Sequence, residues 1–228
     1  MQKKYIPFAA LLVIMLVILA HIGIRLTAAV PAFTFAEEEK QVYLTFDDGP
    51  STKVTPRILD ILEEENVKAT FFVVGDRIAG REDILRRIVK DGHTVGVHSQ
   101  THDYSKIYSS DKALLADIDA CAATVKKVTG SAPTVYRFPF GGTKERKRLT
   151  SLVEEKGYQV VGWNAVCGDE ELPNASAETL YLQSVKTSKG IRKVVLLCHD
   201  STTHAATAEA LPRIIEHFRE AGYVFRAF

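Results

Sequence analysis

The chain has 228 residues, of which 46% are hydrophobic and 25% are charged, and its formal net charge is +1. This length allows one sizeable hydrophobic core, and the composition is that of an ordinary globular protein. The net charge misrepresents the folded part, because residues 1–36 contain Lys3, Lys4 and Arg25 but no acid. Without them the 29 basic residues become 26, against 28 acidic ones, so the remaining charge is −2. That balance gives no support for nucleic-acid binding, and we expect a monomer with no nucleic-acid partner.

Residues 1–36 are predicted to be a targeting segment, either a signal peptide or an N-terminal membrane anchor. A short basic start precedes an uncharged apolar run over residues 6–20, and small residues follow it. Thr34-Phe35-Ala36 is an acceptable cleavage site, although the apolar run is long enough to approach a membrane span. In both cases the N-terminal lysines stay inside and residues 37–228 cross the membrane. We therefore expect an extracytoplasmic domain that is either secreted or anchored to the membrane.

From residue 42 to the end, apolar runs alternate with amphipathic stretches. The predicted strands are 42–46, 69–74, 94–97, 134–137, 159–163, 194–198 and 224–227. The predicted helices are 55–65, 81–91, 111–129, 144–156, 176–188 and 207–221, and most of them stop at a glycine. This alternation predicts an α/β fold with a parallel sheet and right-handed crossovers. Seven strands and six helices favour a closed or nearly closed barrel, and an open doubly wound sheet is the alternative.

Reactive residue types follow the predicted strands at their C-terminal ends. They are Asp47, Asp48, His98, His102, Arg137, Asp169 and His199. Barrels and open parallel sheets build their active sites at this end of the strands. The placement therefore predicts that these residues share one site.

His98 and His102 are four residues apart, which we expect to place both imidazoles on one face of a helical turn. One carboxylate of the Asp47-Asp48 pair could complete a three-residue metal site with an open coordination position, as in catalytic metal sites. Neighbouring carboxylates at a strand end diverge, so one can face a metal while the other faces a water. Simpler interpretations exist for both pairs. Asp-Gly-Pro is a strong turn signal, and two histidines at this spacing often lie on a solvated helix face.

Arg137 ends a predicted strand and is followed by the constrained stretch Phe-Pro-Phe-Gly-Gly. A permanent charge there could keep a neighbouring carboxylate ionised, and a surface ion pair is the alternative. His199 should emerge at the rim after the apolar strand 194–198, where a histidine can donate a proton to a leaving group. A satisfied core histidine is the alternative for His199.

Four motifs make the chain resemble the polysaccharide deacetylase family with the NodB homology domain (carbohydrate esterase family 4). They are Thr45-Phe46-Asp47-Asp48-Gly49-Pro50, His98-Ser99-Gln100-Thr101-His102, Arg137-Phe138-Pro139-Phe140 and Leu197-Cys198-His199. The resemblance covers residues 40–228, and residues 37–228 are predicted to form the catalytic domain. It implies a NodB-like fold, a distorted barrel of the (β/α)7 type. It also implies that Asp48, His98 and His102 bind a divalent metal, most often zinc, with cobalt among the alternatives.

The resemblance implies roles for the other motif residues as well. Asp47 would be the general base that accepts a proton from the attacking water, and Arg137 would orient it. His199 would be the general acid that protonates the departing amine. A backbone N–H near Phe140 is expected to help stabilise the oxyanion.

The family's fourth motif, Trp-x-x-Asp-x-x-Asp-Trp, is incomplete in this chain. Trp163 and Asp169 match its first and third defined positions, whereas Val166 and Glu170 replace the other two. Asp169 takes the position that orients His199, so the acid arm is expected to be intact, while the substrate wall beside it departs from the family. Substrate contacts are expected from Phe140, Gly141, Trp163 and Leu197. For Trp163 a core position is an equal alternative.

The resemblance implies a hydrolase that removes N-acetyl groups from N-acetylglucosamine residues of a cell-wall or chitin-like polysaccharide. Its expected partner is that glycan, either peptidoglycan or a chitooligosaccharide, together with the membrane if residues 1–36 stay attached. The alternatives are an O-acetyl esterase acting on xylan or wall sugars, and a non-catalytic relic that binds glycan or metal. The intact Asp47, Arg137 and His199 oppose the relic, because binding alone needs no acid–base pair.

Overall fold

The computed structural model describes residues 13, 15, 17, 39–172 and 174–228. The chain divides into two compact units, Met1–Glu37 and Glu38–Phe228. The predicted signal peptide or anchor lies outside the described residues, apart from Val13, Met15 and Val17. Among the described residues, no helix combines the length and the apolar character needed to cross a membrane.

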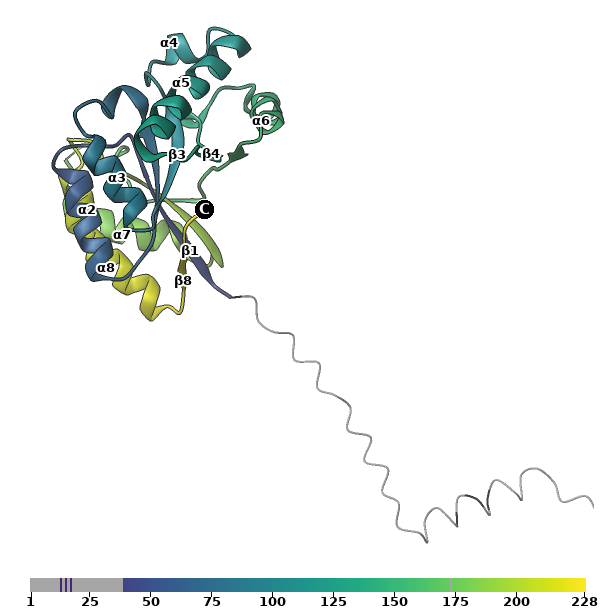
Figure 1. Ribbon diagram of the computed structural model, residues 1–228. Helices are drawn as coiled ribbons and strands as arrows, with labels where there is room; N and C mark the ends of the chain where they lie inside the picture. Colours follow the sequence, from purple (N-terminus) through teal and green to yellow (C-terminus); the bar gives the residue numbers. More distant parts are fainter. Residues whose placement is uncertain (1–12, 14, 16, 18–38, 173) are drawn as a thin grey trace, which may run out of the picture. The chain divides into compact units, whose positions relative to one another are not determined.

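Short strands alternate with helices along the second unit (Figure 1). The strands are β1 (Gln41–Asp47), β2 (Thr70–Val74), β3 (Thr94–Ser99), β4 (Val135–Tyr136), β5 (Gln159–Val160), β6 (Ala165–Val166), β7 (Lys193–His199) and β8 (Val224–Arg226). The α-helices are α2 (Val54–Glu64), α3 (Glu82–Lys90), α4 (Tyr104–Ile107), α5 (Asp111–Thr129), α6 (Arg146–Glu155), α7 (Ala177–Ser188) and α8 (Ala205–Glu220). Two short 3-10 helices, η1 (Gly75–Arg77) and η2 (Pro139–Gly141), follow β2 and β4.

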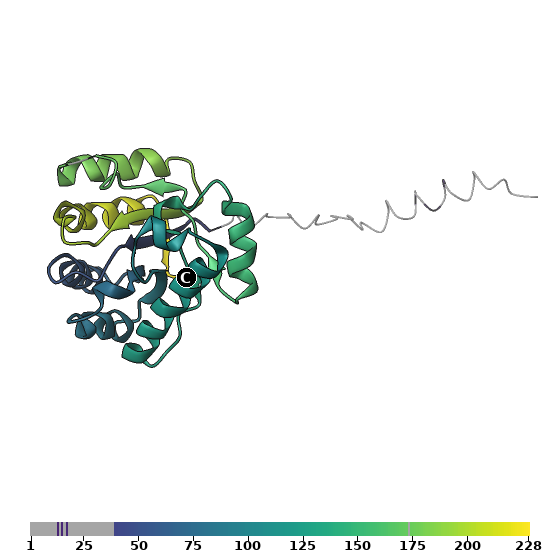
Figure 2. The same cartoon turned by 90° about the horizontal axis from the view of Figure 1, so that it is seen from above.

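All the strands belong to one parallel sheet. Seven of them are hydrogen-bonded in the order β5-β4-β3-β2-β1-β7-β6, and β8 pairs with the first half of β1. Figure 2 shows the sheet curling, with the helices along its outer side. Neighbouring helices pack on one another in the order α7, α8, α2, α3 and α5, and the main core joins strand and helix side chains. The predicted α/β fold with a curled parallel sheet is therefore confirmed.

Residues 161–164 bridge the two ends of this strand order. The Val161 N–H donates to a carbonyl of β4 at 2.8 Å, whereas the Asn164 N–H donates to a carbonyl of β7 at 3.2 Å. Oδ1 of Asn164 also accepts a hydrogen bond from the backbone N–H of Val195 in β7, at 2.8 Å. This segment thus crosses between β5 and β6, for which no strand pairing is found in the described part of the chain.

The predicted strand 159–163 is wrong in its second half. β5 ends at Val160, and β6, for which no strand is predicted, begins five residues later at Ala165. The physical reason is the buried side chain of Arg137, which donates from Nε to the Val161 carbonyl (3.3 Å) and from Nη2 to the Gly162 carbonyl (3.0 Å). Because these two carbonyls accept hydrogen bonds from a guanidinium and not from a neighbouring strand, the chain does not continue as an ordinary strand after Val160.

Gly96 of β3 makes room for an aromatic ring inside the curled sheet. The Phe72 ring fills that space, and the Arg137 guanidinium lies 4.3 Å from its centroid. A Cβ on Gly96 would approach the Phe72 ring to 2.6 Å and a methyl of Val135 to 2.9 Å. The missing side chain therefore supports the surface on which Arg137 rests.

We expect Gly96→Ala to lower the free energy of unfolding by about 1–3 kcal/mol, because overpacking a closed interior forces neighbouring groups to shift. Urea denaturation of the full chain measures the change. Gly162→Ala is the control, since its Cβ would meet only the far end of the flexible Arg146 side chain, at 3.3 Å. Equal losses of stability in the two variants would contradict the prediction.

Candidate metal centre and active site

The strands that carry the predicted site residues end at the same edge of the sheet. Asp47 ends β1 and lies in register with His199, which ends β7. His98 lies in β3, and Arg137 directly follows β4. The structure thus brings the predicted metal-binding and proton-transfer residues together, as the strand ends suggested.

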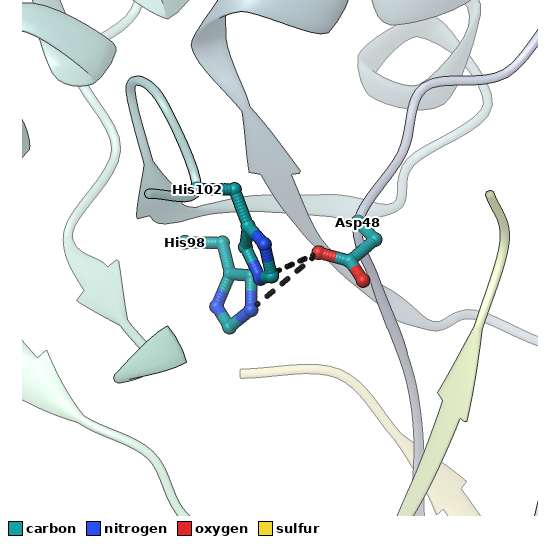
Figure 3. Close-up of side chains that lie close together, drawn as sticks. All are labelled: Asp48, His98 and His102. Carbon is teal, nitrogen blue, oxygen red and sulfur yellow. Dashed lines mark ion pairs between the residues drawn. The ribbon is translucent and has the colours of Figure 1, made fainter. Parts of the chain in front are cut away.

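The three predicted metal ligands converge (Figure 3). Oδ1 of Asp48 lies 3.0 Å from Nε2 of His102 and 3.7 Å from Nε2 of His98. Nδ1 of His98 is hydrogen-bonded to the Arg137 carbonyl at 2.9 Å, which orients the ring so that Nε2 faces the carboxylate. Oδ1 of Asp48 is buried and has no hydrogen-bond partner among the described residues. One carboxylate with an unused buried oxygen and two imidazoles fit a divalent cation such as zinc.

The directions of the pKa shifts of Asp48 and His102 also suit a metal. Burial alone would raise the pKa of Asp48, but the charges of His98, His102 and Arg77 lower it below its ordinary value. Burial lowers the pKa of His102, against the opposing attraction of Asp48. Ionised carboxylate and neutral imidazole are the forms that bind metals.

His98 and His102 do not lie on a helical turn, contrary to the expectation from their spacing. β3 ends at Ser99, and His102 lies in the following loop with φ of +54°. The loop is held by Asp117 of α5, whose carboxylate accepts hydrogen bonds from the Ser99 hydroxyl (2.7 Å) and the Gln100 N–H (3.0 Å). The Ser99 hydroxyl in turn accepts the His102 N–H at 2.9 Å. These side-chain acceptors replace the backbone carbonyls that a helix would have supplied.

The predicted general base, Asp47, is held by a buried guanidinium. Arg137 is fully buried, and its Nη1 donates to Oδ1 of Asp47 at 2.9 Å and to the Thr45 hydroxyl at 2.7 Å. Burial lowers the pKa of Arg137 and Asp47 opposes that shift, but a guanidinium remains charged in proteins. Oδ2 of Asp47 makes no such contact and lies 3.9 Å from Nε2 of His98. One carboxylate oxygen is therefore fixed, and the other faces the metal ligands.

The predicted general acid, His199, is held by Asp169. Nδ1 of His199 lies 2.8 Å from Oδ1 of Asp169, and Oδ2 accepts the His199 N–H and the Thr207 hydroxyl, both at 2.7 Å. Burial disfavours the charged imidazole, but the hydrogen bond to Asp169 and the nearby carboxylates raise the pKa of His199 to about 9. His199 therefore favours the protonated form that an acid needs, with Nε2 left free of Asp169.

Asp169, His199 and His204 also lie close enough together to form a second possible metal group. Both oxygens of Asp169 are already used by hydrogen bonds from His199 and Thr207. Nδ1 of His204 is bonded to the Ser201 hydroxyl at 2.7 Å. The Asp169 carboxylate therefore has no oxygen free of hydrogen bonds, unlike that of Asp48. We describe Asp169 as the residue that supports His199 and not as a metal ligand.

The chain shows clear similarity to known deacetylases in sequence and structure. The family model described as polysaccharide deacetylase matches residues 36–161. A peptidoglycan-N-acetylglucosamine deacetylase of Bacillus cereus is 30% identical over 209 residues, which cover 90% of this chain and 75% of that protein. The peptidoglycan-N-acetylmuramic acid deacetylase PdaA of Bacillus subtilis is 30% identical over 196 residues, which cover 83% of this chain and 70% of that one.

Among solved structures, the catalytic domain of a peptidoglycan N-acetylglucosamine deacetylase from Eubacterium rectale superposes with a TM-score of 0.75 at 31% identity. The match covers 85% of this chain and 93% of that domain. The chain belongs to the polysaccharide deacetylase family. The resemblance inferred from its four motifs, and the NodB-like fold, are thereby confirmed.

In this member of the polysaccharide deacetylase family, the three predicted metal ligands and both predicted proton-transfer residues line one pocket of about 220 Å³. The four residues predicted to contact substrate, Phe140, Gly141, Trp163 and Leu197, line it too. Phe140 has φ of +57°, and its ring, which is about half exposed, lies 4.6 Å from that of His102. Trp163, which is only partly buried, is thus part of the pocket wall and does not belong to the buried core.

The incomplete fourth motif changes the chemistry of one wall of this polysaccharide deacetylase pocket. Glu170 stands where the family has a tryptophan, and it lines the pocket together with Glu171. Nε2 of His204 lies 3.4 Å from the Glu170 carboxylate. Val166 lies in β6, where its N–H and carbonyl both bond the Thr187 hydroxyl. The wall beside Asp169 is therefore acidic instead of aromatic.

Several residues that hold this polysaccharide deacetylase site were not predicted to do so. They are Thr45, Arg77, Asp117 and Thr207. Thr45 lies within the first motif, so its position was a usable signal. The other three lie on elements away from the motifs, and only the folded arrangement brings them to the site.

We expect Asp117→Asn to weaken zinc binding by about 10–100-fold, the usual effect of removing a group that orients a metal ligand. The amide has one acceptor oxygen where the carboxylate has two, so the loop that carries His102 loses part of its support. Titration of zinc against a competing chelator measures the affinity. Asp119→Asn is the matched control on the same helix, because Asp119 is exposed and, among the described residues, pairs only with Lys156. Unchanged zinc affinity in Asp117→Asn would show that the loop does not depend on this carboxylate.

Proposed function

We propose that this protein is a metal-dependent N-deacetylase that removes acetyl groups from N-acetylglucosamine residues of a cell-wall polysaccharide. The observation that carries the proposal is that two differently supported proton-transfer groups face one metal triad in one pocket. Asp47 is fixed by a cation, Arg137, and His199 is fixed by an anion, Asp169. A site that only binds metal or glycan needs neither pair.

Asp48, His98 and His102 would hold the metal, and zinc suits this donor set. When bound, the metal supplies a Lewis acid that polarises the acetyl carbonyl and makes the attacking water more acidic. Asp47 then accepts the proton of that water at its free oxygen Oδ2. His199 gives the proton on Nε2 to the amide nitrogen as the C–N bond breaks, which releases acetate and the free amine. Backbone N–H groups around Phe140 would stabilise the oxyanion between these two steps.

The nature of the glycan is supported by the relatives. Those from Bacillus cereus and Eubacterium rectale are named for peptidoglycan N-acetylglucosamine, and the one from Bacillus subtilis for N-acetylmuramic acid. We propose peptidoglycan as the substrate in the cell, with chitooligosaccharides as soluble analogues. We also propose that the enzyme works outside the cytoplasm, which the sequence of residues 1–36 supports.

We expect Asp47→Asn to reduce the rate of acetate release from chitotetraose by about 10²–10⁴-fold, because the amide cannot take the proton of water. The variant should still bind zinc, since the three ligands are unchanged. Asp76→Asn is the control, because the one hydrogen bond of that exposed carboxylate within the described part of the chain comes from the Gln100 side chain. Retained turnover in Asp47→Asn would remove the base from the proposed mechanism. Faster release from an O-acetylated xylan than from chitotetraose would favour the esterase instead.

We expect the alkaline fall of kcat/KM to depend on Asp169. The acid His199 must be protonated, and its pKa is about 9, so kcat/KM should fall as the pH rises through about 9. Asp169→Asn removes the group that raises this pKa most, so the fall should move to lower pH. A pH profile of acetate release measures it. In the control Glu170→Gln the fall should stay in place, because Glu170 bonds His204 and not His199. An unshifted fall in Asp169→Asn would exclude His199 as the acid.

A further inference from the structure

A second imidazole lies against that of His199. The rings of His199 and His204 are stacked, with their centroids 5.1 Å apart and their planes inclined by 27°. Aromatic rings at this separation are in contact face to face. His204 directly precedes α8 and belongs to residues 201–207, a segment after β7 that none of the four motifs includes. The contact is therefore a feature of the folded chain that the motifs do not predict.

His204 is held in place by its own segment. Nδ1 of His204 lies 2.7 Å from the Ser201 hydroxyl, and Nε2 lies 3.4 Å from the Glu170 carboxylate. The His204 N–H donates to the Ser201 carbonyl at 3.1 Å, which closes the turn before α8. Only 12% of the His204 side chain is exposed. The ring is thus fixed through Ser201 and the backbone of the turn, independently of His199.

The start of α8 holds both members of the Asp169–His199 pair. The Thr207 hydroxyl donates to Oδ2 of Asp169 at 2.7 Å, and the Thr207 N–H donates to the His204 carbonyl at 3.1 Å. His204 stacks on the imidazole of the pair, and Thr207, three residues later, bonds the carboxylate. One hydrogen-bonded turn therefore positions the imidazole and the carboxylate relative to each other.

The hydrogen bond to Asp169 constrains only one end of the His199 ring. Nδ1 lies at that end, 2.8 Å from Oδ1 of Asp169, whereas Nε2 lies at the opposite end. His199 also lines the active-site pocket, so protein does not enclose its ring on every side. A tilt about the fixed end displaces Nε2 the most, and proton transfer is sensitive to such displacements. A flat group against one face of the ring limits that tilt.

We propose that His204 is a positioning residue for proton transfer by His199. Its stacked ring fixes the plane of the His199 imidazole, so that Nε2 points toward the departing nitrogen. The described residues that line the active-site pocket do not include His204, so it acts through His199 and not on the substrate. This inference rests on the proposed function, because it takes His199 to be the general acid.

A hollow of about 100 Å³ beside His204 makes a discriminating pair of substitutions possible. His204, Asp169 and Thr207 are among the residues that line it. A phenyl ring is slightly larger than an imidazole, and the hollow gives it room while its face stays against His199. His204→Phe therefore keeps the stacked ring and loses only the ring nitrogens, whereas His204→Ala loses both.

The first measurement is kcat and KM for acetate release from chitotetraose by the zinc-loaded full chain. We expect His204→Ala to lower kcat about 10–100-fold with KM nearly unchanged, because a displaced acid slows bond breaking and not substrate binding. His204→Phe should recover part of kcat. His217→Ala is the matched control and should behave as the wild type. His217 is also a partly buried histidine of α8, but its ring meets that of Tyr181 edge-on at 6.2 Å.

The second measurement follows the His199 ring without turnover, by NMR of zinc-loaded protein isotope-labelled in its histidine rings. A ring proton on Nδ1 that is bonded to a buried carboxylate exchanges slowly with water and gives a separate signal. His199→Gln assigns this signal by its loss. We expect the signal in the wild type, His204→Phe and His217→Ala, and a broadened or missing signal in His204→Ala.

An unchanged kcat in His204→Ala would overturn the proposal, and so would a lower kcat with an unchanged His199 signal. A wild type without this signal, or equal losses in His204→Phe and His204→Ala, would overturn it as well. If the wild type deacetylates no glycan but only His204→Ala loses the His199 signal, the proposed function fails and the positioning of the ring stands. If turnover is normal and His204→Ala changes neither readout, the function stands and the positioning fails.

Discussion

The buried guanidinium of Arg137 is the interaction on which both the fold and the site depend. It donates to four acceptors, which are Thr45 Oγ1, Asp47 Oδ1 and the carbonyls of Val161 and Gly162. β1 and β4 are not neighbours in the sheet, so these contacts cross the interior of the curled sheet. A buried charge that loses its partners costs several kcal/mol. The fold is therefore stable only while β1, the end of β4 and the bridging segment stay together.

The same residue sets the position of one proposed metal ligand, His98, relative to the proposed base, Asp47. The side chain of Arg137 fixes Asp47. The backbone carbonyl of Arg137 accepts a hydrogen bond from Nδ1 of His98 at 2.9 Å. The proposed base and one proposed metal ligand thus share a single support that is rigid because it is buried. Proton transfer and carbonyl polarisation must act on the same substrate atoms, and this common support keeps their geometry fixed.

Much of this arrangement could be predicted from the sequence, because it follows from where parallel strands end. The apolar runs that became β1 and β7 placed Asp47 and His199 correctly, and the motifs picked out three side chains that converge in the structure, Asp48, His98 and His102. The run over residues 159–163 resembled one strand, since nothing local shows that a distant arginine takes its carbonyls. The prediction of a helical turn for His98 and His102 was wrong for a similar reason. The acceptor that shapes that loop is Asp117, on the later helix α5.

Three residues of the candidate site have an unfavourable local conformation. Asp48, His102 and Phe140 have φ of +76°, +54° and +57°, and each such residue costs about 1–3 kcal/mol unless its surroundings impose it. Asp48 adds a buried oxygen without a hydrogen-bond partner among the described residues. A ligand that binds only the folded chain offsets such costs, because it stabilises the folded state. The loops at the candidate metal site are therefore kept in this conformation by the packed strands that they follow, at a cost in stability that metal binding would offset.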